Sequence, residues 1–144
     1  MSIYNDVLCM CYGSKFVIVT SRYDKDMQQK VFANIRKIHL EDENLIITSC
    51  INFQVAGGSN YVDWTCIAVG LSNGSIKFYS ETGSLIYEKE LHNEPILNMR
   101  LIGEELMAFY PSCIIVYQTA HLISLLKTLK EMLNKAKTAK IDLM

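Results

Sequence analysis

Residues 64–91 read WTCIAVGLSNGSIKFYSETGSLIYEKEL, and this stretch decides the fold. Two turn signals, SNG at 72–74 and ETG at 81–83, divide it into three runs of strand length. The first run is almost wholly apolar, as in a buried strand, whereas the second, SIKFYS, alternates in hydrophobicity. Asn and Gly in the first turn tolerate the positive φ that a type I′ hairpin turn requires. The stretch therefore predicts a three-stranded antiparallel meander.

Further runs of strand length lie on both sides of this meander. Ile76 in SIKFY and Ile114 in SCIIVY occupy similar places and are 38 residues apart. Repeats of about 40 residues, each with four short strands, are the sequence sign of a β-propeller. We therefore expect a mainly β fold, a partial β-propeller with WD-like blades. The blades are expected at 6–40 and 45–91, with a partial third from 95. The additional strands are predicted at 6–12, 15–21, 31–40, 45–55, 96–102, 106–110 and 113–117, with a loop at 56–60 (AGGSN).

The last segment, from 119 to about 140, predicts an amphipathic α-helix. It contains no Gly or Pro, and apolar residues recur at i, i+3, i+4 and i+7. Residues 119–144 carry five lysines against two acids, a local charge of +3. Such a helix either packs its apolar stripe into a partner or its own domain, or lies on an anionic membrane, and packing is the more common fate. The stripe supplies the candidate partner-binding residues Leu122, Leu125, Leu126, Leu129, Met132 and Leu133.

The chain divides into an incomplete propeller-like domain of about two and a half blades at 1–118 and the helix and tail at 119–144. A net charge of −1 over 144 residues gives no general attraction to nucleic acid. Five cysteines, most in apolar runs, fit reduced core thiols better than disulfides. The start lacks the pattern of a signal peptide, and no window reaches 18 uncharged apolar residues. We expect a cytoplasmic protein.

Residues capable of catalysis are few and isolated. Each of the three histidines stands alone, and His92 sits where propellers often place a loop histidine that hydrogen-bonds within the blade. Cys9 and Cys11 would point to one side of a strand, but without a second pair at zinc spacing they indicate core packing rather than metal. Gly57-Gly58 lacks the lysine and helix of a phosphate loop. We expect no enzyme activity, no cofactor and no metal.

Partner binding fits the sequence better than catalysis. An incomplete propeller exposes apolar blade faces and an unpaired strand edge to water, which favours an interaction or scaffold role. Residues 63–101 and 110–137 resemble the N-terminal region of the non-catalytic, regulatory subunit of the Rab-three GTPase-activating protein. The resemblance rests on DWTCI at 63–67, the Gly-containing turn after it, the aromatic pair Phe78-Tyr79, an acidic-X-Gly turn and a Pro-headed strand. It continues through YPSCIIVY and the Leu-rich, Lys-bearing helix.

The resemblance implies a propeller-like domain that pairs with a catalytic subunit. That partner supplies the arginine that accelerates GTP hydrolysis on Rab-three GTPases, and the pair is also implicated in nucleotide exchange on Rab-eighteen. Arg22, Arg36 and Arg100 match no arginine-finger motif. The leading hypothesis is a regulatory domain that binds the catalytic subunit and serves a Rab GTPase indirectly in vesicle traffic. The alternative is a stand-alone propeller-type adaptor that makes peripheral contact with vesicle membranes through the basic helix.

Overall fold

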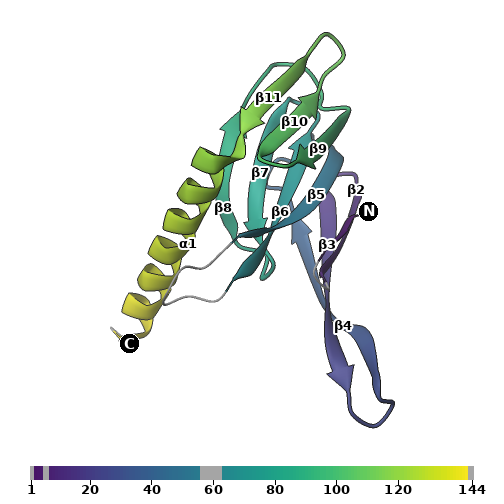
Figure 1. The fold of residues 1–144 in the computed structure, drawn as a ribbon, viewed down its shortest axis with the longest axis vertical. Coiled ribbons are helices and arrows are strands. Elements are labelled where there is room, and N and C mark those ends of the chain that lie inside the picture. The colour runs from purple at the N-terminus through teal and green to yellow at the C-terminus, as the bar shows by residue number, and fades with distance from the viewer. Residues whose placement is uncertain (1, 5–6, 56–62, 143–144) are drawn as a thin grey trace.

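A computed structural model describes residues 2–4, 7–55 and 63–142 of the chain. The predicted loop at 56–60 and the last two residues of the tail lie outside this part. Within it, the chain is mainly β with one long helix near the C-terminus, as the sequence predicts (Figure 1). The elements are β1 (Ser2–Tyr4), β2 (Val7–Tyr12), β3 (Lys15–Asp24), β4 (Gln29–His39), β5 (Ile47–Val55), β6 (Trp64–Leu71), β7 (Ser75–Ser80), β8 (Leu85–Glu90), β9 (Asn98–Ile102), β10 (Glu105–Phe109), β11 (Ile114–Gln118) and α1 (Thr119–Asp142).

The described strands form three antiparallel sheets in which neighbours in space are neighbours in sequence. We call them blade 1 (β1 to β4), blade 2 (β5 to β8) and blade 3 (β9 to β11). Their limits follow the repeat pattern of the sequence. The short strand β1 was not predicted; it pairs with β2 and completes blade 1. The β3–β4 hairpin is longer than predicted and projects away from the other blades (Figure 1).

Blade 2 is the centre of the molecule, because both of its faces are covered. Every residue of β6 and β7 is buried, which explains the almost continuous apolar run that the sequence shows. Since side chains alternate along a strand, Cys66 and Ala68 face one core cluster and Ile67 and Val69 face the other. The first cluster contains residues of blade 3 and α1, and the second contains residues of blade 1. The molecule is therefore a stack of three layers with blade 2 in the middle.

The turn between β6 and β7 differs from the prediction. The Gly74 N–H donates to the Leu71 carbonyl at 3.0 Å, and the loop has three residues rather than two. Gly74 has φ of +91°, but Asn73 is not among the described non-glycine residues with positive φ. A type I′ turn needs both, so that prediction was wrong. Three-residue loops that end in a left-handed glycine are the next most common hairpin connection.

Blade 1 is held against blade 2 by hydrogen bonds as well as by the core. The Ile47 N–H donates to the Gly13 carbonyl at 2.8 Å, and the Asn52 side-chain amide donates to the Val7 carbonyl at 3.0 Å. These bonds lie at the two ends of the contact between β2 and β5. They fix how far β2 can slide along β5.

Candidate protein-binding site

The helix α1 is built into the domain through the first part of its apolar stripe. Leu122 and Leu126 are fully buried and belong to the core cluster that contains Trp64 and Phe78. The helix lies along β8 and also contacts β5, so that it covers the part of blade 2 that blade 3 leaves open (Figure 1). These two leucines therefore serve the fold of their own domain.

The remaining stripe residues keep exposed surface. Leu125, Leu129 and Leu133 are half-buried, and Met132 is 59% exposed. Periodicity alone could not separate these four from Leu122 and Leu126, because all six recur at helical spacing. That the stripe binds a partner stays a prediction, and these four are the side chains that still have surface to offer.

Two lysines of α1 are turned towards blade 2. The Lys130 ammonium lies 5.5 Å from the centre of the Trp64 ring, a cation–π contact. Burial, and secondarily the charge of Lys137, lowers the pKa of Lys130, while Glu81 opposes the shift. The Lys137 ammonium donates to the Ser84 hydroxyl at 3.2 Å. These contacts tie the basic side of the helix to its own domain.

The face of blade 3 that points away from blade 2 carries a partly exposed apolar row on β10 and β11, with Arg100 and Asn98 of β9 beside it. Its centre is a cross-strand row in which Met107 pairs with Val116, and Phe109 pairs with Ile114. Ile114 is 53% exposed and Val116 is 46% exposed. The sequence signal for this face is the run IIVY at 114–117. An unbroken apolar run of strand length indicates a strand that is buried on both faces. Within the described residues, only the face of β11 that points towards blade 2 is covered.

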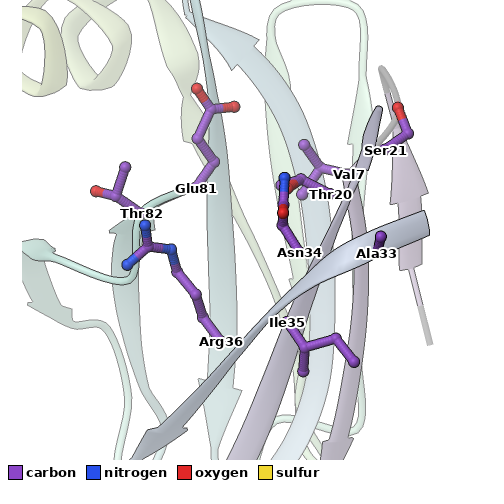
Figure 2. A pocket seen from close by; sticks show the side chains of 9 residues that line it. All are labelled: Val7, Thr20, Ser21, Ala33, Asn34, Ile35, Arg36, Glu81 and Thr82. Carbon is purple, nitrogen blue, oxygen red and sulfur yellow. The ribbon is translucent and has the colours of Figure 1, made fainter. Parts of the chain in front are cut away.

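A hollow of about 790 Å³ lies between blade 1 and the turn that joins β7 to β8 (Figure 2). Arg36 extends from β4 towards Thr82, and the Glu81 side chain lies above both in this view (Figure 2). The nine described residues that line it include no histidine or cysteine. The lining consists of Val7, Thr20, Ser21, Ala33, Asn34, Ile35, Arg36, Glu81 and Thr82.

His92 has a structural role at the junction of blades 2 and 3, as the sequence suggests. Its Nε2 lies 2.7 Å from Glu94 Oε1, and its ring packs edge-on against Tyr110 with centroids 5.0 Å apart. The Tyr110 hydroxyl donates to the Gly74 carbonyl at 2.9 Å. Glu94 also accepts a hydrogen bond from the Ser112 hydroxyl. This bond is the main reason that the pKa of Glu94 is lowered, and the hydrogen bond with His92 adds to the shift. The group joins the β6–β7 turn to blade 3.

Three stacked antiparallel sheets in sequence order are the architecture of a β-propeller. A chain of the mitotic checkpoint complex, known from its crystal structure, matches with a TM-score of 0.54 and 15% identity. The match covers 81% of this chain and 31% of that one. The C-terminal WD40 domain of Sif2 matches with a TM-score of 0.53 and 15% identity, over 86% of this chain and 34% of that one. The present chain thus spans about a third of each of these chains and shares the fold of the part that it matches.

The family follows from the whole sequence. The model of the Rab3 GTPase-activating protein regulatory subunit N-terminus matches residues 1–143, and the chain belongs to this family. This confirms the resemblance seen at 63–101 and 110–137. The family is that of a regulatory subunit rather than a catalytic one. Among the described residues, no helix is long and apolar enough to cross a membrane.

Proposed function

We propose that this chain is a non-enzymatic domain that binds the catalytic subunit of a Rab GTPase-activating complex. Through that subunit it supports GTP hydrolysis on a Rab GTPase in vesicle traffic in the cytoplasm, and support of nucleotide exchange is part of the same proposal. The family match over 1–143 carries the proposal. We also propose that the chain divides into a propeller-like part at 1–118 and a helix with tail at 119–144.

The exposed apolar side chains of α1 support this proposal. Leu125, Leu129, Met132 and Leu133 of α1 remain partly or largely exposed, and the helix is held in place by two buried leucines. A helix fixed in this way needs no further ordering of its backbone when a partner binds, so only its side chains lose conformational freedom. Apolar surface on a preformed helix is what a protein partner buries, since centrally placed large side chains carry most binding energy. We assign these four residues to the contact with the catalytic subunit.

Co-purification of the chain with the catalytic subunit from the same organism tests the proposal. We expect a complex at micromolar concentration that Met132→Glu weakens at least tenfold, because the variant places a charge in the centre of the contact. Ser124→Glu is the matched control, since Ser124 is exposed on the same helix outside the apolar stripe. Absence of a complex would overturn the proposed function, whereas equal binding by both variants would overturn only the assignment of the surface.

The alternative is a stand-alone adaptor that lies on vesicle membranes through the basic helix. Lys127 and Lys135 are available for it, but Lys130 and Lys137 contact blade 2. This arrangement reduces the charge that α1 can present to an anionic surface. We therefore expect the chain to stay unbound in flotation with phosphatidylserine vesicles. Flotation that is lost when Lys127 and Lys135 are replaced by Gln would favour the adaptor instead.

A further inference from the structure

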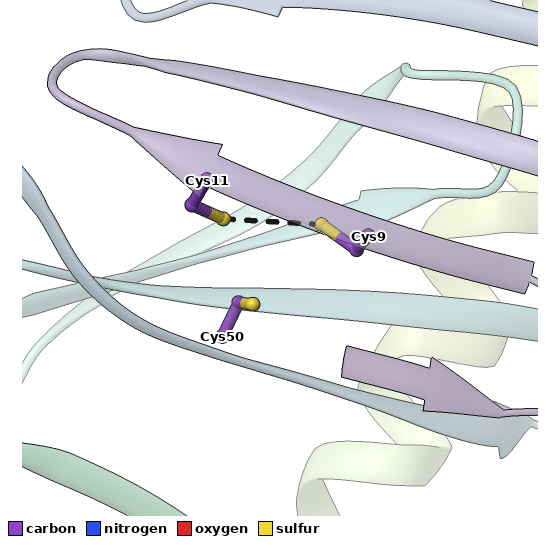
Figure 3. A group of neighbouring side chains, drawn as sticks. All are labelled: Cys9, Cys11 and Cys50. Carbon is purple, nitrogen blue, oxygen red and sulfur yellow. Dashed lines mark hydrogen bonds between the residues drawn. The ribbon is translucent and has the colours of Figure 1, made fainter. Parts of the chain in front are cut away.

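Three cysteines from two blades meet between β2 and β5. Cys9 and Cys11 lie on one side of β2, and Cys50 lies opposite them on β5 (Figure 3). The three Sγ atoms all lie within 4.8 Å of one another, and the Sγ atoms of Cys9 and Cys11 are 3.9 Å apart. Cys9 is buried, while Cys11 and Cys50 are half-buried. The cluster is therefore reachable from solvent on one side.

The fold holds these thiols in place. Alternation along β2 turns both Cys9 and Cys11 towards β5. The hydrogen bonds Ile47–Gly13 and Asn52–Val7 fix β2 against β5 on either side of the cluster. Packing alone would explain one or two small apolar thiols at such a contact. Three thiols that converge on one point, two of them only half-buried, form a geometry that packing does not require.

The distances fit a thiophilic metal ion. A tetrahedral ion with metal–sulfur bonds of about 2.3 Å places its sulfur ligands about 3.8 Å apart. The Cys9–Cys11 separation of 3.9 Å matches this value, and the limit of 4.8 Å for the other pairs needs only a small movement of Cys50. Thiolate sulfur selects soft or borderline ions such as Zn²⁺ and Cu⁺ over Mg²⁺ and Ca²⁺.

The three thiols also shift one another's pKa values. Hydrogen bonds from the Cys11 and Cys9 thiols lower the pKa of Cys50. The hydrogen bond with Cys50 raises the pKa of Cys11 to about 12, and the hydrogen bonds with Cys11 and Cys50, followed by burial, raise the pKa of Cys9. Metal binding at cysteine sites displaces the thiol protons.

We propose that Cys9, Cys11 and Cys50 bind one thiophilic metal ion, Zn²⁺ or Cu⁺, through three thiolates. The ion joins β2 to β5 and so clamps blade 1 to blade 2. Its remaining coordination position faces the half-exposed side of the cluster and is filled by water or an external ligand in the case of Zn²⁺. The sequence did not reveal the site, because Cys50 is far from Cys9 and Cys11 along the chain and joins them only through the packing of two blades.

Metal titration of the reduced, metal-free chain tests the proposal. Zn²⁺ is added against a chromophoric chelator, Co²⁺ serves as a spectroscopic substitute, and Cu⁺ is added without oxygen in a separate arm. We expect one equivalent of Zn²⁺ or Cu⁺ to bind, with a thiolate charge-transfer band in the Co²⁺ sample if Zn²⁺ is the ion. Cys50→Ser and Cys11→Ser each remove the binding at this cluster, whereas Cys66→Ala, which changes a buried cysteine that belongs to no group of described residues able to hold a metal ion, does not.

A second readout keeps the test independent of variant stability. The unaltered chain is alkylated with iodoacetamide with and without metal, and the labelled cysteines are located by mass spectrometry. We expect the metal to protect Cys9, Cys11 and Cys50 and to leave Cys113 reactive. Equal labelling in both samples, less than one bound equivalent of either ion, or full binding by a folded Cys50→Ser variant would overturn the proposal.

Discussion

Replacing Leu126 with alanine tests whether α1 is an integral part of the domain. The Leu126 side chain is fully buried in the cluster that includes Trp64 and Phe53. Truncation of a buried leucine to alanine costs about 2–5 kcal/mol, because the transfer free energy is lost and a cavity remains. The helix can settle partly towards β8, since it forms an outer layer. We therefore expect the free energy of unfolding to fall by about 2–3 kcal/mol, in the lower half of that range.

Urea unfolding followed by circular dichroism measures this change. Met132→Ala is the matched control on the same helix, because its side chain is 59% exposed and the change should stay within about 0.5 kcal/mol. Alanine is the best helix former, so helix propensity cannot account for a loss of stability in either variant. At about 2–4 °C per kcal/mol, Leu126→Ala should also lower Tm by about 4–12 °C. Equal midpoints for the two variants would refute the claim that α1 belongs to the core.

Two further predictions concern the junction of blades 2 and 3. In the same urea assay, Gly74→Ala should lower the free energy of unfolding by at least about 2 kcal/mol. The reason is that a Cβ at this left-handed position would lie 1.7 Å from the His92 carbonyl oxygen. Unchanged stability would mean that the β6–β7 turn does not contact the 92–94 loop. The lowered pKa of Glu94 contributes stability that is present above its unfolded pKa and lost as pH falls through the folded value. Glu94→Gln should therefore be less stable than the unaltered chain at pH 7, and the difference should shrink as the pH falls below the ordinary glutamate pKa and vanish below the lowered folded value; a difference that persists at still lower pH would contradict this linkage.

Patterns that depend on nearby residues were predictable from the sequence. β6 and β7 have the predicted limits, because their apolar and alternating runs are bounded by glycine turns. The helix begins at Thr119 as predicted, where the strand pattern gives way to helical spacing. β1 was missed because three residues are too few to show a period. The prediction of a type I′ turn at Asn73 was wrong because the same Asn-Gly pair also suits a three-residue loop.

Contacts between blades could not be predicted from the sequence. Helical spacing identifies an apolar face but not what covers it, so the pattern grouped Leu122 and Leu126 with Met132. The meeting of Cys50 with Cys9 and Cys11 depends on how blade 1 lies against blade 2. Tertiary packing decides both cases, and no local spacing encodes it.

Binding to the catalytic subunit is the central claim, and sedimentation velocity measures it most directly. The purified chain and the purified catalytic subunit of the same organism are mixed at micromolar concentration. We expect one faster-sedimenting species with one copy of each protein, which Met132→Glu dissociates and Ser124→Glu leaves intact. Separate sedimentation of the two proteins at every mixing ratio would overturn the proposed function.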